Sequence, residues 1–325
     1  MASSTTSRTQ TGTAASQYDA PAAPPDGADR RLEDRYLRKA FRHHSRTFSL
    51  ATRLLPRRER LPVAVLYLYC RTVDTLADER VAVIGTEAAL REVDALEADL
   101  EGTLEGRPPD TLLWRRLAEV HRTYDLPRRP LKQLLEGARW DLEGRTVDTT
   151  EDLLAYSNLV AGSVGAAMLP FLVRRPEDRH VLEAAARALG NAMQITNILR
   201  DVGEDWRDLG RTYLPADLLE QRGVDLDVVV GKAPPVPQSY INLTEDLMGQ
   251  AERLYDQAAD GIEALRPAAQ TGIRGAARMY REFLNGVRAN QYDNLSRRAS
   301  VPLSRKLRAL ARDGYARRRD RLWAT

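Results

Sequence analysis

The sequence predicts an all-α protein. In long stretches rich in Ala, Leu, Arg and Glu, apolar residues recur at intervals of three and four, which is the period of an amphipathic helix. Series of alternating β-branched residues, the usual signal of strands, are nearly absent. The chain has 325 residues, of which 43% are hydrophobic and 29% are charged, as is typical of globular proteins.

The periodic segments define the predicted helices in order. They cover residues 32–49, 62–80, 86–105, 111–124, 129–144, 150–173, 176–205, 242–265 and 267–297, with a last helix after Pro302. Residues 210–239, which include RTYLP and KAPPVPQ, are expected to be irregular. We predict a disordered N-terminal extension over residues 1–30, rich in Ser, Thr, Ala and Pro, and one helical domain over residues 31–325.

Residues 153–173 form an uncharged stretch of 21 residues, which is long enough to cross a bilayer. Small and polar residues dilute its hydrophobicity, so we predict a buried core helix rather than a membrane span. These residues are Ser157, Asn158, Gly162, Ser163, Gly165 and Pro170. The protein is therefore expected to be cytoplasmic, with peripheral contact to a membrane left open.

Charge and cysteine content exclude several functions. The 49 basic and 46 acidic residues give a net charge of only +3, so the overall charge does not indicate nucleic-acid binding. Cys70 is the only cysteine, which excludes an intrachain disulfide and a cysteine cage for a metal. The four histidines show no HExxH spacing, so any bound metal must be held by carboxylates.

Two pairs of aspartates stand four residues apart, namely Asp74 with Asp78 and Asp201 with Asp205. On a helix, residues at this spacing lie on the same face. Stacked carboxylates repel each other by roughly 0.2 to 0.5 kcal/mol, so a cation is expected to offset the repulsion. Each pair follows a mostly apolar helix and has an arginine within one turn upstream.

A solvated charged face is the simplest interpretation of any one such pair. Two pairs with upstream arginines favour another interpretation, because carboxylate oxygens are the ligands that Mg²⁺ prefers. Mg²⁺ commonly joins one or two carboxylates to the phosphate oxygens of a substrate. The pattern therefore predicts a diphosphate-binding site.

Five motifs between about His44 and Lys306 resemble the squalene/phytoene synthase family, whose members join two prenyl diphosphates head to head. They are HSRTF at 44–48, YLYCRTVDTLADE at 67–79, YSNLVAGSVG at 156–165, NILRDVGED at 197–205 and RTYLP at 211–215. Thr47 departs from the serine of the family's HSxSF segment. The resemblance implies an isoprenoid synthase bundle with a central cavity, and with the acidic pairs on opposing helices at its mouth.

The resemblance also implies roles for individual residues. The metal ligands are Asp74, Asp78, Asn197, Asp201 and Asp205, and the four aspartates act in catalysis together with Tyr156. The residues expected to bind diphosphate are Ser45, Thr47, Tyr67, Arg71, Arg200, Tyr280 and Arg297. A tunnel for the prenyl chain is expected to be lined by Phe48, Val160, Ala161 and Gly162.

The implied enzyme is a prenyltransferase that uses Mg²⁺, with Mn²⁺ as the alternative ion. It couples two prenyl diphosphates through a cyclopropyl intermediate, as a phytoene synthase does with geranylgeranyl diphosphate. A squalene or dehydrosqualene type of product is the variant, and only squalene would require NADPH. Prenyl chain length, oligomeric state and pathway do not follow from the motifs.

Two other hypotheses remain at this point. An aryl prenyltransferase of the same fold would move an allylic group, such as dimethylallyl, onto an aromatic acceptor such as an indole or carbazole. Thr47 and the long GKAPPVPQ connection motivate it, and a fold does not determine its acceptor. In the other hypothesis the protein is a helical scaffold without catalytic activity, and the acidic pairs are surface features.

Overall fold

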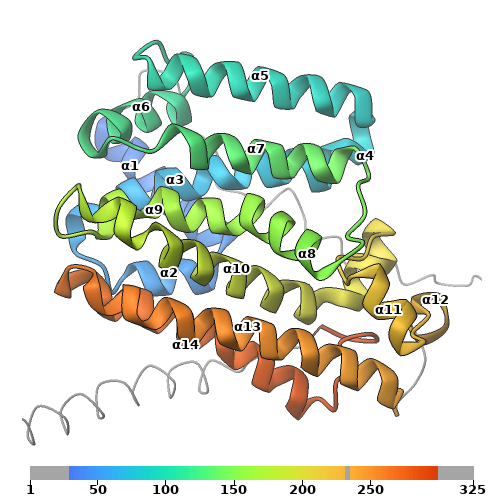
Figure 1. Ribbon diagram of the computed structural model, residues 1–325. Coiled ribbons are helices and arrows are strands. Elements are labelled where there is room, and N and C mark those ends of the chain that lie inside the picture. The colour runs from blue at the N-terminus through green and yellow to red at the C-terminus, as the bar shows by residue number, and fades with distance from the viewer. Residues whose placement is uncertain (1–28, 231–234, 299–325) are drawn as a thin grey trace, which may run out of the picture.

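The computed structural model describes residues 29–230 and 235–298, and within them every regular element is a helix, as predicted (Figure 1). The predicted extension over residues 1–30 lies outside the described part except for its last two residues, and so does the predicted helix after Pro302. The division into an extension and one domain stays a prediction.

The first half of the bundle consists of seven α-helices and one π-helical turn, η2. They are α1 (Arg30–His44), α2 (Arg46–Thr52), α3 (Arg57–Thr75), η2 (Leu76–Arg80), α4 (Val81–Ile84), α5 (Thr86–Leu104), α6 (Leu112–Tyr124) and α7 (Arg128–Leu142). Figure 1 shows α5, α7, α9, α10 and α13 crossing the molecule as successive, roughly parallel layers.

The second half contains the central helix α10, which contacts α8, η3, α9, α13 and α14. The elements of the second half are α8 (Thr150–Ser157), η3 (Asn158–Gly162), α9 (Ser163–Leu172), α10 (Asp178–Glu204), η4 (Asp205–Leu209), α11 (Ala216–Arg222), α12 (Leu226–Val229), α13 (Gln238–Ala264) and α14 (Pro267–Ala289). The turns η3 and η4 are again π-helical. Helices α11 and α12 lie in the segment that we expected to be irregular.

Two large groups of buried side chains form most of the core. The first belongs mainly to α3, α5, α6, α7 and α9, and it includes Leu66, Leu100, Leu117, Leu135 and Phe171. The second belongs mainly to α10, α13 and α14, and it includes Ile195, Leu199, Leu243, Met248 and Leu284. The cavity described below lies between the two groups, because α3 and α9 line it from one group and α10 and α14 from the other.

The uncharged stretch predicted as one core helix forms α8, η3 and α9, which pack against α7 and α10. Leu153 and Phe171, near its two ends, are fully buried. In the part of the chain that the structure describes, Thr150–Leu172 is the one helix that is long and apolar enough to span a membrane, with a mean hydropathy of 1.3. Fewer than half of its residues (44%) are buried, and others, such as Val160 and Val164, line the apolar cavity described below.

Glycines allow this stretch to approach α10 closely. A Cβ added to Gly165 would lie 2.2 Å from the carbonyl oxygen of Ala186, and one added to Gly190 would lie 2.2 Å from that of Ala161. Both contacts are with backbone atoms, which cannot move aside as a flexible side chain can. Gly165 therefore sets the distance between α9 and α10, and Gly190 sets that between η3 and α10.

Several predicted helix boundaries are wrong, including the start of α13, which begins at Gln238 and not at residue 242, and three others have a clear local cause. The first helix breaks at Ser45, whose extended backbone ends α1 and whose hydroxyl accepts a hydrogen bond from the Phe48 amide to begin α2. Helix α3 begins at Arg57, so Pro62 lies inside it and removes only one intrahelical hydrogen bond. Helix α14 ends at Ala289, and Gln291 and Tyr292 follow with positive φ.

We expect Gly190→Ala to lower the free energy of unfolding by about 1 to 3 kcal/mol, because the added methyl group overlaps the Ala161 carbonyl. Gly249→Ala in α13 is the matched control, since its methyl group meets only the Arg253 side chain, at 3.5 Å. The control is expected to raise stability by about 0.4 to 1 kcal/mol. Urea denaturation followed by circular dichroism measures both, and equal effects would contradict the proposed close approach.

Candidate active site

Three of the five predicted motifs lie where an α-helix passes into a π-helical turn. Asp74 and Asp78 span the junction of α3 with η2, and Asp201 and Asp205 span that of α10 with η4. Tyr156 lies in α8 just before η3. Single π-helical turns occur frequently at functional sites because they re-aim the side chains beside them.

The aspartate pairs face one polar cavity of about 420 Å³. Ser45, Tyr67, Arg71, Asn197 and Arg200 line it as well, so most of the residues predicted to bind diphosphate and metal meet here. The two pairs lie close enough to interact, since the charge of Asp78 contributes to raising the pKa of Asp205. The structure thus brings the two acidic motifs together, although 127 positions separate Asp74 from Asp201.

The electrostatics of the cavity disfavour four negative charges without a cation. Burial among protein atoms, and then the charge of Asp78, raises the pKa of Asp74 to about 7. Burial and the charge of Asp201 likewise raise the pKa of Asp205 to about 7. Burial also raises the pKa of Asp78, while Arg211 and Arg71 oppose the shift. A bound cation would remove this penalty.

Arginines surround the second pair. The Asp201 carboxylate accepts hydrogen bonds from Arg200 Nε at 2.7 Å and from Arg298 Nη2 at 3.0 Å. Arg298 Nε lies 2.8 Å from the other oxygen, so its planar group contacts both. On the opposite side of the cavity, Arg71 pairs with Glu79. These guanidinium groups are placed to contact the oxygens of an anionic ligand as well.

The donor set fits magnesium bound together with a substrate. Within the described residues, no three carboxylate, imidazole or thiol groups lie close enough together to hold an ion by themselves. Mg²⁺ needs only one or two carboxylates when phosphate oxygens and water complete its shell. The buried Asn197 side-chain oxygen lines the same cavity and has no hydrogen-bond partner, so an oxygen ligand remains available there.

Tyr156 belongs to a cluster that the motifs did not predict. Its hydroxyl donates to Asp141 Oδ2 at 3.0 Å, and the Tyr213 hydroxyl donates to Asp141 Oδ1 at 2.9 Å. The two phenol rings stack with centroids 4.7 Å apart and an angle of 17° between their planes. Burial raises the pKa of Asp141 to about 6, although the hydrogen bond from Tyr213 opposes the shift.

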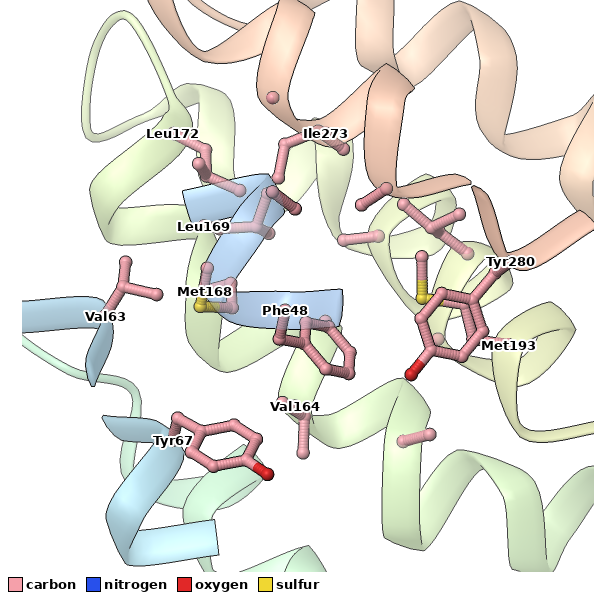
Figure 2. Close-up of a pocket in the computed structure, with 18 of the residues that line it drawn as sticks. Phe48, Val63, Tyr67, Val164, Met168, Leu169, Leu172, Met193, Ile273 and Tyr280 are labelled. Carbon is pink, nitrogen blue, oxygen red and sulfur yellow. The ribbon is translucent and has the colours of Figure 1, made fainter. Parts of the chain in front are cut away.

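A second, apolar cavity of about 280 Å³ continues from the polar one, and Phe48 lies where the two meet. Phe48 projects from α2 between Tyr67 and Tyr280, as Figure 2 shows, with ring centroids 6.1 Å and 5.4 Å away. Side chains from α9 and α14, such as Met168, Leu172 and Ile273, line the interior. Seven residues line both cavities: Phe48, Tyr67, Asp74, Val160, Gln194, Asn197 and Tyr280.

Two predicted site residues lie elsewhere. Gly162 does not line the apolar cavity as Val160 and Ala161 do, because its Cα faces α10, where an added Cβ would lie 2.5 Å from Asn191 Oδ1. Arg297 does not line the polar cavity; it is 67% exposed and lies 3.4 Å from Asp293. The side chain of Thr47 lies outside the described part of the structure.

Three further residues of the site were absent from the sequence prediction. Asp141 does not belong to any recognisable motif, since it follows Trp140 on an ordinary amphipathic helix. Tyr213 lies in the RTYLP motif, where its position between Arg211 and Pro215 was a usable signal. Arg298 directly follows Arg297, and only the irregular backbone after α14 decides which of the two faces Asp201.

Paired carboxylates and arginines at the mouth of an apolar cavity, inside an all-helical bundle, define a site for a molecule with an anionic head and a long apolar tail. Comparisons with known proteins agree with this class. The family model for squalene/phytoene synthase matches residues 41–305. The phytoene synthase of Rhodobacter capsulatus is 40% identical over 274 residues, which are 83% of this chain and 77% of that protein.

Solved structures give the same result. A dehydrosqualene synthase bound to a ligand superposes with a TM-score of 0.78 at 33% identity, covering 88% of this chain and 97% of that one. The squalene synthase HpnC of Alicyclobacillus acidocaldarius has a TM-score of 0.69 at 28% identity, covering 81% and 95%. The chain therefore belongs to the squalene/phytoene synthase family, and it is an enzyme that condenses prenyl diphosphates head to head. These relatives give no support to an aromatic acceptor.

We expect Tyr213→Phe to lower kcat about tenfold or more, because it keeps the ring stack but removes one of the two hydroxyls that donate to Asp141. Tyr255→Phe is the matched control, since it also removes a buried hydroxyl. This hydroxyl forms a hydrogen bond of 3.0 Å with Thr196, and neither residue lines either cavity. Steady-state kinetics and thermal unfolding are measured on both. Equal losses of activity in the two variants would contradict a specific role for Tyr213.

Arg298→Gln is expected to lower kcat/KM roughly tenfold to 100-fold, because it removes a charged group that contacts Asp201 at the polar cavity. Arg297→Gln, one residue earlier, is expected to stay within about twofold of the native value, because its side chain points to Asp293 and solvent. Parallel kinetics distinguish the two positions. A larger loss from the Arg297 variant would contradict the observed arrangement.

Proposed function

We propose that the protein joins two molecules of geranylgeranyl diphosphate head to head into a C40 hydrocarbon, through a cyclopropyl intermediate. The observation that carries this proposal is the union of the two cavities at Phe48, because one site then holds a diphosphate and the adjoining prenyl chain. The 40% identity to a phytoene synthase supports the C20 substrate over a C15 one. A cytoplasmic location is part of this proposal.

The polar cavity binds the diphosphate groups. Asp74, Asp78, Asp201 and Asp205, with the free oxygen of Asn197, are the residues that would hold Mg²⁺, or Mn²⁺ as the alternative. Bound there, the ion would supply positive charge that offsets the negative charge on a departing diphosphate. Arg71, Arg200 and Arg298 are placed to donate hydrogen bonds to the same phosphate oxygens.

In the first half of the reaction, the bond between C1 and oxygen of one substrate breaks, and its electrons leave with inorganic diphosphate. The double bond of the second substrate then attacks the allylic cation, and loss of a proton closes the cyclopropane ring. The cation must be kept from water during these steps. The side chains beneath Phe48, among them Val164, Met168 and Met193, provide a lining that offers water few partners.

In the second half, the bond between C1 and the remaining diphosphate breaks, the resulting cyclopropylcarbinyl cation rearranges with opening of the ring, and loss of a second proton gives the hydrocarbon. Tyr156 and Tyr213 border the polar cavity next to the reacting centre. Because both hydroxyls donate to Asp141, the phenol oxygens and rings gain electron density. Electron-rich aromatic groups stabilise a nearby cation. No reductant enters this sequence, whereas a squalene product would need NADPH.

We expect the purified protein with Mg²⁺ and geranylgeranyl diphosphate to release two diphosphates for each C40 hydrocarbon formed, without NADPH. Removal of the ion with EDTA is expected to abolish both products, because the acidic pairs then lack the cation that offsets their repulsion. Gas chromatography with mass spectrometry identifies the hydrocarbon, and farnesyl diphosphate serves as the C15 control. Release of diphosphate without a C40 product would contradict the assignment, and a C30 product alone would change the substrate.

A further inference from the structure

A third hollow, the arginine groove, lies outside the site described above. It measures about 640 Å³ and is formed by α1, α2 and the first residues of α3. Its lining consists of seven arginines, one acid and three other residues: Arg31, Arg35, Arg38, Arg42, Arg53, Arg57, Arg60, Asp34, Phe41, Ser49 and Thr52. This concentration of positive charge stands out in a chain whose net charge is only +3.

Four of the arginines form one stripe along α1. Residues 31, 35, 38 and 42 are spaced by four, three and four, so their side chains project from the same face of the helix. Arg53 and Arg57 flank the turn between α2 and α3 and face the stripe across the groove. Arg57 is the first residue of α3, where the positive end of the helix dipole also favours an anion.

These charges are not neutralised by neighbouring acids in the described structure. Arg31, Arg35, Arg38, Arg42, Arg53 and Arg57 are exposed, and none of them forms an ion pair with a described residue. The one acid in the lining, Asp34, pairs with the buried Arg116 instead. Arg60 donates to the carbonyl oxygens of Leu55 at 2.9 Å and of Arg53 at 2.6 Å, and so it fixes the turn.

The groove adjoins the apolar cavity. Phe41 and Thr52 line both hollows. The seven-residue helix α2 separates them, with Phe48, Ala51 and Thr52 turned to the cavity and Ser49, Thr52 and Arg53 to the groove. Two large apolar side chains next to groove arginines face solvent: Leu32 is 47% exposed and Leu54 is 38% exposed.

We propose that the arginine groove is the surface by which the protein docks onto a membrane that contains anionic phospholipids. A lipid surface and a soluble phosphate compound both present phosphate groups, which arginine recognises through its planar donors. A lipid surface is favoured over a soluble phosphate because exposed leucines flank the arginines, and such a combination binds the boundary between headgroups and acyl chains. The thin wall at α2 also places the apolar cavity next to the bilayer.

The test compares binding to vesicles of phosphatidylcholine with binding to vesicles of phosphatidylcholine and phosphatidylglycerol. Each arginine near an anionic surface contributes about fivefold to partitioning. The triple variant Arg31→Gln, Arg35→Gln and Arg38→Gln is therefore expected to bind the anionic vesicles about 100-fold more weakly than the native protein. The control variant is Arg122→Gln, Arg129→Gln and Arg253→Gln, which removes the same charge from exposed arginines outside the groove.

Sedimentation with vesicles gives the partition coefficients, and it does not depend on which hydrocarbon the enzyme makes. Retained binding by the groove variant, equal loss in the control variant, or equal binding of the native protein to neutral vesicles would each overturn the proposal. Glycerophosphoglycerol, at the same phosphate concentration as the vesicles, serves as the soluble phosphate compound for comparison. Binding to it as tight as to the vesicles would assign the groove to a soluble anion instead.

The active site and the groove are separate sets of residues, so the two proposals can fail independently. The groove variant is expected to keep the native kcat with geranylgeranyl diphosphate dispersed in detergent, because none of its three positions lines the catalytic cavities. Circular dichroism and thermal unfolding verify that it folds. Weak vesicle binding with native activity is the expected result.

Discussion

The structure is organised around four carboxylates that converge on one mouth of the central cavity. Burial, and then the repulsion from a neighbouring carboxylate, raises the pKa of Asp74 and of Asp205 to about 7, so the protein meets a free-energy cost when it holds them there as anions. Arg200 and Arg298 offset part of this cost at Asp201. A cation stabilises the carboxylates of this site, and a polyanion stabilises its arginines. The site therefore favours binding of the two together, which is what ionisation of a diphosphate ester requires.

The three π-helical turns show how the bundle brings these groups to one place. Long helices such as α3 and α10 would otherwise continue past the cavity with a regular α-helical spacing of side chains. A π-helical turn inserts an extra residue and re-aims the side chains near it. Each of η2, η3 and η4 adjoins a functional motif, so the irregularities of the helices coincide with the residues of the site.

Much of the fold followed from the period of the apolar residues, and the aspartate pairs followed from their spacing. The break at Ser45 was missed because the residues on both sides of it continue a helical pattern, although Ser is a favoured N-cap. Arg298 could not be found because Gln291 and Tyr292 adopt positive φ, which ends the helical register that pointed to Arg297. Asp141 could not be found because its role arises from two hydroxyls that approach it from other parts of the chain.

The position of α2 relates the chemistry to the environment of its substrates. Prenyl diphosphates have soluble heads, but a C40 hydrocarbon has none and partitions into lipid. Helix α2 has seven residues and carries Phe48 at the junction of the two cavities, and its other face borders the arginine groove. So short a helix depends on packing rather than on its own propensity for stability. Helix α2 therefore separates the apolar cavity, which holds the prenyl chains in the proposed reaction, from the surface that we propose rests on the membrane.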